Sequence, residues 1–286
     1  GLMLSPGWVG TTAVADIPLP SNVRRYYIPS TRHGGGGGGF SVTPAAAPNC
    51  PGPDFGPGTF AENPVPHTET VNAIREHFRN WVMHDTLPPP SRYPTLADGF
   101  LADPTRAAMG FPTIPGVPGD APTGMVNPML HYDWGADFDH LGGSGVPSNV
   151  PPVVRQVIKM KVPRVDADGN ELGGVPVVLR DAPLGTYLGW NVVADGFHKG
   201  KLCNYAGGMI PFAETQAARM ANGDPRLSLE ERYQSHEGYV EAVKAAAANA
   251  VVEKFLLPAD ADALVAEATE SDVLRQTPAT ASSGGQ

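Results

Sequence analysis

The sequence predicts an α/β fold: a strand, a histidine-bearing loop and an amphipathic helix come first, and a loop-rich α+β region follows. Three observations indicate this fold. Residues 23–28 form a short apolar and aromatic run typical of a strand. His33 follows in a loop, after Pro29 and Ser30 end the run. Apolar side chains then recur at helical spacing over residues 68–84, and capping signals mark further helices in the last third of the chain.

Composition limits the classes of protein to which the chain can belong. Its 286 residues suffice for one large domain or two ordinary ones. The 34 glycines and 31 prolines indicate long, shaped loops and modest regular structure. A net charge of −9 and the absence of a basic stripe argue against a nucleic-acid partner. No apolar run reaches the length of a membrane span, and no basic signal-peptide region opens the chain.

The first unit is expected over residues 1–87. It contains the strand, His33, a Gly- and Pro-rich insertion at 34–63 and the helix at 68–84. The insertion opens with six glycines and is expected to form a mobile excursion or a lid near His33. The glycine run lacks the Lys-Ser/Thr signature of a phosphate loop. The chain does not begin with Met, so we expect a fragment or a processed chain.

The second unit is expected to be an appendage over residues 88–274. Alternation over 156–165 and a second apolar run that ends at 179 predict a β-hairpin over 156–179. Helices are expected at 211–222, 229–256 and 260–272, the second opened by a capping box that starts at Ser228. Residues 275–286 are expected to form a disordered tail.

His33 and Asp16 are the candidate catalytic residues. A histidine just past a strand end can project into a cleft while the strand fixes its backbone, which suits a general base. Asp16 is the one carboxylate before His33, and it would orient the imidazole ring. The alternatives are a surface histidine beside a flexible glycine segment and an ordinary turn aspartate.

An aromatic segment supplies the candidate substrate-binding residues. Tyr187, Trp190 and Asn191 stand among glycines, which let the backbone approach a ligand closely while the aromatic rings form a rigid wall. The alternative is a tightly packed loop.

Metal and cofactor signals are weak. One polar loop offers oxygen and nitrogen donors without a defined spacing, and we interpret it as a solvated loop rather than a metal site: His131, Asp133, Asp137, Asp139 and His140. A second run imitates the start of a calcium loop but lacks its glycine and closing glutamate, so a turn is expected: Asp166, Asp168 and Asn170. No cofactor is predicted.

Residues 142–146 miss the G-x-S-x-G pattern by one position. Cys50 and Cys203 form either one disulfide or two buried thiols.

Seven blocks, in order, together resemble one family. They are NVRRYYIPSTRHG, NWVMHDTLPPPSRYPTLADG, GFPTIPGV, KVPRVDADGNELGGVPV, APLGTYLGWN, IPFAETQAARMANGDPRLSLEERY and VVEKFLLPADADALVAEA. They resemble the large bacterial alpha/beta hydrolase domain proteins over residues 1–272. The resemblance implies that His33 is the triad base at the end of the last core strand, and that residues 88–274 are a family-specific appendage.

The resemblance also implies a function. The chain is expected to be the C-terminal part of a serine-type hydrolase acting on an ester or related acyl substrate. The nucleophile would come from the missing N-terminal half of the core, in cis or in trans, and the whole protein would be periplasmic or secreted. Two alternatives are a non-catalytic interaction module, because this chain contains no nucleophile elbow, and a metal-dependent hydrolase built on the 131–140 loop.

Overall fold

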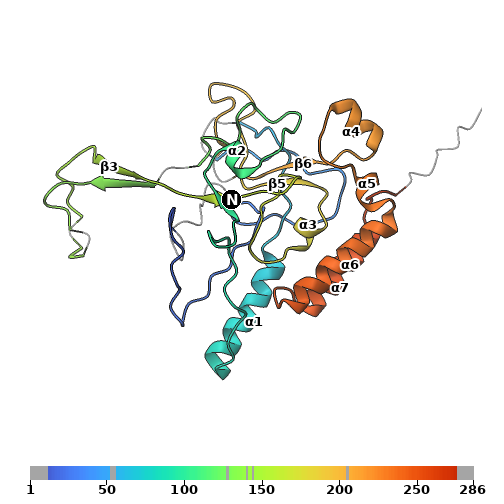
Figure 1. Ribbon diagram of the computed structural model, residues 1–286, viewed down its shortest axis with the longest axis horizontal. Helices are drawn as coiled ribbons and strands as arrows, with labels where there is room; N and C mark the ends of the chain where they lie inside the picture. Colours follow the sequence, from blue (N-terminus) through green and yellow to red (C-terminus); the bar gives the residue numbers. More distant parts are fainter. Residues whose placement is uncertain are drawn as a thin grey trace, which may run out of the picture.

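A computed structural model of the chain describes residues 12–51, 56–126, 129–139, 141–143, 145–203 and 206–275 (Figure 1). It shows mixed helices and small antiparallel sheets. The elements, in chain order, are α1 (Thr68–His84), β1 (Leu101–Ala102), α2 (Arg106–Met109), β2 (Met129–Asp133), β3 (Val153–Ile158), β4 (Val162–Pro163), α3 (Val178–Asp181), β5 (Gly185–Leu188), β6 (Gly208–Pro211), α4 (Gln216–Asn222), α5 (Leu229–Tyr233), α6 (His236–Val252) and α7 (Pro258–Glu270). In this described part, no helix is both long and apolar enough to cross a bilayer.

The main core lies between the β5–β6 pair and the C-terminal helices. β5 pairs with β6 in antiparallel register, and Tyr187 lies opposite Met209. Both residues are buried together with Tyr239 and Val243 of α6. α7 lies beside α6, and α3 packs against α6 from the other end of the core (Figure 1). A second buried cluster surrounds Trp190.

The insertion at 34–63 packs against this core instead of forming a separate excursion. Isolated bridges join Gly58 to Val193 and Ala61 to Met209, so the insertion extends the β5–β6 pair at its edge. Phe40 of the insertion is buried against Tyr239, at 6.1 Å between ring centroids. Apolar burial therefore fixes a segment whose composition had indicated mobility.

α1 spans the same residues as the predicted helix. Its cap is His67 instead of Thr68, and it ends at Asp85, which adopts a left-handed φ of 53°. Phe78 and Val82, from the apolar stripe of α1, are 61% and 65% exposed. α1 extends away from the rest of the body at the lower edge of Figure 1.

The C-terminal helices differ from the prediction at their ends. The single helix expected over 229–256 is two helices, because Gln234 takes a positive φ of 64° between them and the Ser235 side chain caps α6. α4 begins after Thr215, whose side chain caps it, so 211–215 are not helical. α7 begins at Pro258, two residues before the predicted start. Apart from Arg275, the predicted tail lies outside the described residues.

The predicted hairpin over 156–179 is wrong. β3 pairs with β2, and β4 pairs with β1. Residues 166–170 form only a tight turn, closed by a single bridge between Val165 and Glu171. The apolar run that was expected to return as a strand is fully buried and ends in α3. Alternation alone did not identify the partner strand, because the partner lies earlier in the chain.

The strand predicted over 23–28 is an extended segment with one parallel bridge, between Tyr26 and Arg92. Tyr27 donates its N–H to the carbonyl of Arg92, at 2.9 Å, and its own carbonyl accepts from Val175 N–H, at 2.8 Å. The residues around Arg92 include Pro88 to Pro90 and Pro94, which have no N–H to donate. A longer ladder therefore cannot form at this edge.

Candidate functional site

His33 lies exposed on a turn that immediately follows a buried anchor. The anchor is Ser30, which is fully buried and holds a positive φ of 57°. Its N–H donates to Oε2 of Glu171 at 2.7 Å, and its Oγ accepts from the N–H of Glu171 at 2.7 Å. The Tyr27 hydroxyl donates to the same Oε2 at 2.7 Å. Glu171 therefore fixes the chain just before His33.

Asn63 fixes the same segment from the other side. Its Nδ2 donates to the carbonyls of Ser30 and Leu188, both at 2.9 Å, and its Oδ1 accepts from Val65 N–H at 2.8 Å. Thr31 Oγ1 donates to the carbonyl of Val65 at 3.1 Å. All these groups are buried, so each hydrogen bond replaces one that water would otherwise provide. The backbone before His33 is consequently rigid.

The start of the glycine run is also held in place. Gly36 donates to the carbonyl of Val65 at 2.7 Å, and a Cβ on Gly36 would lie 2.2 Å from the carbonyl carbon of Pro64. A Cβ on Gly35 would lie 2.9 Å from the ring of His67, at the start of α1. These two glycines permit a close backbone approach that no other residue allows. Gly35 and Gly36 are therefore closely packed, and the catalytic role of His33 stays a prediction.

The electrostatic surroundings of His33 are mildly basic. Burial lowers the pKa of His67, and the charges of His33 and Arg32 lower it further. His67 is therefore neutral at pH 7. Arg32 forms an ion pair with Glu62. As a result, the charge beside His33 is partly compensated.

Asp16 occupies a different setting from the one expected of a triad acid. Its two carboxylate oxygens accept the backbone N–H groups of Leu96 and Ala97, each at 2.9 Å. This is how a loop aspartate stabilises a turn. The structure therefore gives Asp16 a visible role in holding the turn at 95–98.

The aromatic segment lies in the core and not on the wall of an open pocket. Tyr187 and Trp190 are 1% and 2% exposed. The Tyr187 hydroxyl accepts the N–H of Leu184 at 3.0 Å, and burial raises the pKa of Tyr187 well above its usual value. Trp190 packs between Phe60 and Phe111, with ring centroids 5.8 Å and 6.1 Å away. These contacts match the alternative of a tightly packed loop.

Asn191 is the polar centre of that core. Its Oδ1 accepts from the N–H groups of Thr59, Phe60 and Val192, at 2.9–3.1 Å. Its Nδ2 donates to the carbonyls of Phe60 and Gly207, at 2.9 and 3.0 Å. One side chain therefore satisfies five backbone groups from three separate segments.

Asp133, one of the donors considered for metal binding, has other partners. Asp133 accepts the N–H of Gly135 at 2.9 Å and pairs with Arg155; these two interactions lower the pKa of Asp133. His140 lies outside the described residues, as does Ser144. Among the residues that are described, no three His, Cys, Asp or Glu side chains converge as metal ligands would.

The calcium-like run forms a turn. Asp166 Oδ1 accepts the N–H groups of Asp168 and Asn170, at 2.9 and 3.0 Å. Asp168 pairs with Arg232. These carboxylates therefore serve the fold.

The disulfide alternative for the two cysteines is the one observed. Cys50 and Cys203 are bonded, with an S–S distance of 2.04 Å. The bond joins the insertion to the segment that follows Asn191, and Val193 and Ala206 pack around it.

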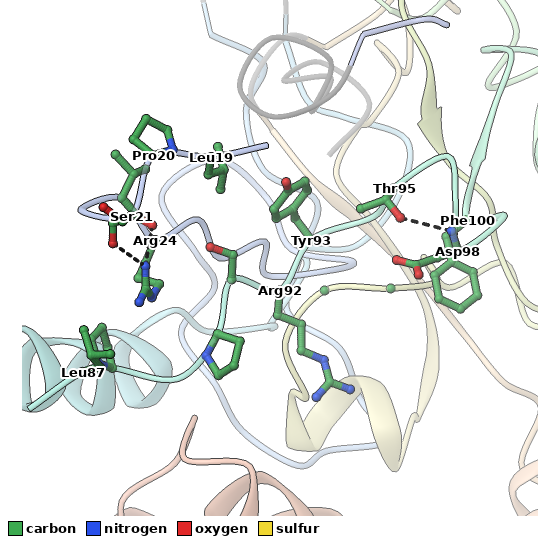
Figure 2. A pocket seen from close by; sticks show the side chains of 16 residues that line it. Leu19, Pro20, Ser21, Arg24, Leu87, Arg92, Tyr93, Thr95, Asp98 and Phe100 are labelled. Carbon is green, nitrogen blue, oxygen red and sulfur yellow. Dashed lines mark hydrogen bonds between the residues drawn. The ribbon is translucent and has the colours of Figure 1, made fainter. Parts of the chain in front are cut away.

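A cleft of about 770 Å³ opens between the N-terminal segment and the loop after α1 (Figure 2). Its wall carries apolar side chains, including Leu19, Leu87 and Tyr93, beside the guanidinium groups of Arg24 and Arg92. Arg24 donates to the carbonyls of Ser21 and Val23 and stacks on Trp81, with its Cζ 5.1 Å from the ring centroid. Arg92 pairs with Glu253. The residues that line this cleft do not include His33.

Residues 10–266 match the family model described as an alpha/beta hydrolase domain. The chain belongs to this alpha/beta hydrolase domain family, and the resemblance found in the sequence is confirmed. No curated protein and no solved structure matches the chain.

Sequence reasoning missed two residues that position His33, namely Glu171 and Asn63. Glu171 ends the run that imitates a calcium loop, and its partner Ser30 lies 141 residues away. No local spacing reveals such a pair. For Asn63, the available signal was an amide directly before the Pro-Val-Pro run at 64–66.

Proposed function

We propose that the chain is part of a serine-type hydrolase that acts on an ester or related acyl substrate, with His33 as the general base. The observation that carries the proposal is the presentation of His33: its side chain is exposed, and buried hydrogen bonds to Glu171 and Asn63 hold the backbone before it. A fixed backbone with an exposed imidazole is what a proton-transfer step requires. Membership of the alpha/beta hydrolase domain family supports the same function.

The proposed chemistry is acyl transfer. A serine hydroxyl attacks the carbonyl carbon of the substrate, and His33 accepts the hydroxyl proton. His33 then returns this proton to the oxygen of the leaving alcohol, and water attacks the acyl-enzyme with the same base. Both oxygens of Asp16 already hold a turn. We therefore assign the orienting carboxylate to the segment that brings the serine.

The surface of α1 supports the need for such a segment. Three apolar side chains in its C-terminal half are 61–66% exposed, namely Phe78, Val82 and Met83, and Leu87 just beyond the helix is 64% exposed. An amphipathic helix normally buries its apolar stripe. We propose that the remaining part of the hydrolase core, in cis or in trans, covers this stripe and supplies the nucleophile.

The disulfide indicates the cellular compartment in which the native protein functions. A bond such as Cys50–Cys203 persists in oxidising surroundings and is rare in the cytosol. We therefore propose that the native protein is periplasmic or secreted.

The decisive experiment replaces His33 in the native protein that contains this chain. We expect His33→Ala to lower kcat/KM for a short-chain p-nitrophenyl ester by about 10⁴-fold, because the serine loses its base. His84→Ala is the matched control, because His84 is an exposed histidine at the other end of α1. The control should retain full activity. Equal activity of His33→Ala and wild type, both correctly folded by circular dichroism, contradicts the assignment.

A non-catalytic interaction module is the second candidate, and the exposed apolar ribbon of β2 and β3 favours it. A serine-directed fluorophosphonate probe distinguishes the two candidates. Covalent labelling of the native protein supports the hydrolase if prior incubation with an ester inhibitor prevents this labelling. A native protein that is neither labelled nor active on esters supports the interaction module.

A further inference from the structure

The β2–β3 arm, residues 129–158 where described, is built unlike the rest of the molecule. β2 and β3 pair only with each other within the described chain, and they extend away from the body at the left of Figure 1. Every residue of β3 is exposed. Val153 and Val157 are 52% and 58% exposed. A two-stranded ribbon alone is marginally stable in water, so this arm requires a covering surface.

A bulge separates the side chains of the arm onto two faces. The register pairs Leu130 with Val157 and Tyr132 with Val154, and it shifts by one residue between these pairs. Arg155 is the extra residue at this shift. In a regular strand, Val154 and Gln156 would lie on the same face, because side chains alternate between the faces and the two residues are two positions apart. The extra residue moves Val154 to the opposite face from Gln156. Of the paired residues, one face therefore carries Leu130, Tyr132, Val154 and Val157.

The opposite face is mixed. Its cross-strand pairs are Met129 with Ile158, His131 with Gln156 and Asp133 with Val153. Aromatic rings continue the apolar face toward the tip, where Trp134 lies 5.4 Å from Tyr132 and 5.5 Å from Phe138 between ring centroids. The apolar face is thus a continuous patch that leads from the base of the arm to its tip.

The charges of the arm indicate what covers this patch. Asp137 and Asp139 place carboxylates at the outer end, and Asp133 beside them is paired with Arg155. The exposed cation at the base is Lys159, which follows β3 directly, whereas Lys161 is paired with Asp103. Two such arms stacked in opposite directions place each acidic tip over the base of the other. Stacking in the same direction, or contact with an anionic lipid surface, would bring like charges together.

We infer that the arm is a dimerisation element, whose apolar face packs on the same face of a second copy with the two arms antiparallel. This contact is isologous, because the same patch serves both subunits. The two ribbons would lie about 10 Å apart, as stacked sheets do. The inference is independent of the proposed hydrolase activity.

The test is sedimentation velocity on the chain over 1–100 μM, with a matched pair of valines. Val157→Lys places a charge in the apolar face and should weaken dimerisation by about tenfold or more. Val252→Lys changes a valine that is 78% exposed at the end of α6, outside the arm, and should leave the dimer intact. A wild-type chain that stays monomeric throughout, or a Val157→Lys chain that dimerises as wild type does, overturns the inference.

A charge change and a cross-link test the arrangement of the two arms. Lys159→Glu should weaken the dimer by repelling the acidic tip of the second copy, and added salt should weaken the wild-type dimer. Val154→p-benzoylphenylalanine, irradiated in a mixture of isotopically light and heavy chains, should give covalent light–heavy dimers joined between the two arms. A cross-link from Val154 to the body of its own chain overturns the inference.

Discussion

The body and the arm of this protein place polar and apolar groups in opposite ways. In the body, Asn63 and Asn191 are fully buried and their amides are hydrogen-bonded. In the arm, Val153, Val154 and Val157 are 48–58% exposed. The buried amides of the body are satisfied by contacts within the chain, whereas the apolar face of the arm is suited to a contact with another molecule.

The buried asparagines follow from the composition of the chain. With 31 prolines and sheets of two strands, many backbone groups have no ladder partner. Asparagine carries both an acceptor and donors on a short side chain. Asn170 shows the same use: its Oδ1 accepts from Tyr187 N–H at 2.8 Å, and its Nδ2 donates to the carbonyl of Gly185 at 3.1 Å. Side-chain amides thus replace strand pairing in this core.

The largest loss of folding stability should come from Asn191→Ala. It removes the side-chain partner of five backbone groups, of which Thr59 N–H keeps the carbonyl of Val192 at 2.8 Å, so we expect a loss of about 3–5 kcal/mol in the free energy of unfolding. Denaturation in urea, followed by circular dichroism, measures it. Asn222→Ala, at the exposed end of α4, is the control and should change the value by less than about 0.5 kcal/mol. A loss below about 1 kcal/mol for Asn191→Ala would show that the core does not depend on its amides.

A matched pair of valines sharpens the comparison. Val243 is fully buried in α6, and Val157 is exposed in β3. Val243→Thr places a hydroxyl in the core and should cost about 1–3 kcal/mol. Val157→Thr should cost less than about 0.5 kcal/mol when measured on the monomer. Equal losses at the two positions would mean that the arm packs within its own subunit.

The smallest loss of folding stability should come from breaking the ion pair between Arg219 and Glu231 in the body. Hydrogen bonds from Arg219 and Ser228 lower the pKa of Glu231 from 4.5 to about 2. A carboxylate with a depressed pKa contributes stability above pH 4.5, and this contribution is lost as the pH falls toward 2. Glu231→Gln should therefore unfold at lower temperature than wild type at pH 7, and the difference should shrink as the pH approaches 2. An equal difference at both pH values, measured by calorimetry, contradicts the ion-pair account.

Local signals in the sequence determined the helices well and the pairing of strands poorly. The apolar spacing of α1 and the prolines after it gave both of its ends, because a helix forms from contacts within one turn. The break at Gln234 was missed, since the helical pattern continues through it. The hairpin over 156–179 was wrong, because β2 and β1 supply the partners from earlier in the chain.

The candidate site depends on local and on distant residues. The choice of His33 rests on a local pattern, a histidine after an apolar run, and its catalytic role stays a prediction. The residues that fix it lie far along the chain, as Glu171 does, and only the folded molecule brings them together. The sequence does not distinguish a pocket wall from a packed core at Tyr187 and Trp190, because aromatic residues among glycines occur both in binding sites and in tightly packed loops.

The distance between Ser30 and Glu171 has a consequence for biosynthesis. The two residues are separated by 141 positions, so the His33 turn leaves the ribosome long before its anchor exists. At about 5–20 residues per second, the wait is on the order of ten seconds. During that time the glycine-rich segment after His33 is an open substrate for proteases. A nascent chain that is stalled before residue 171 should accordingly be cut there, and the full-length chain should be protected.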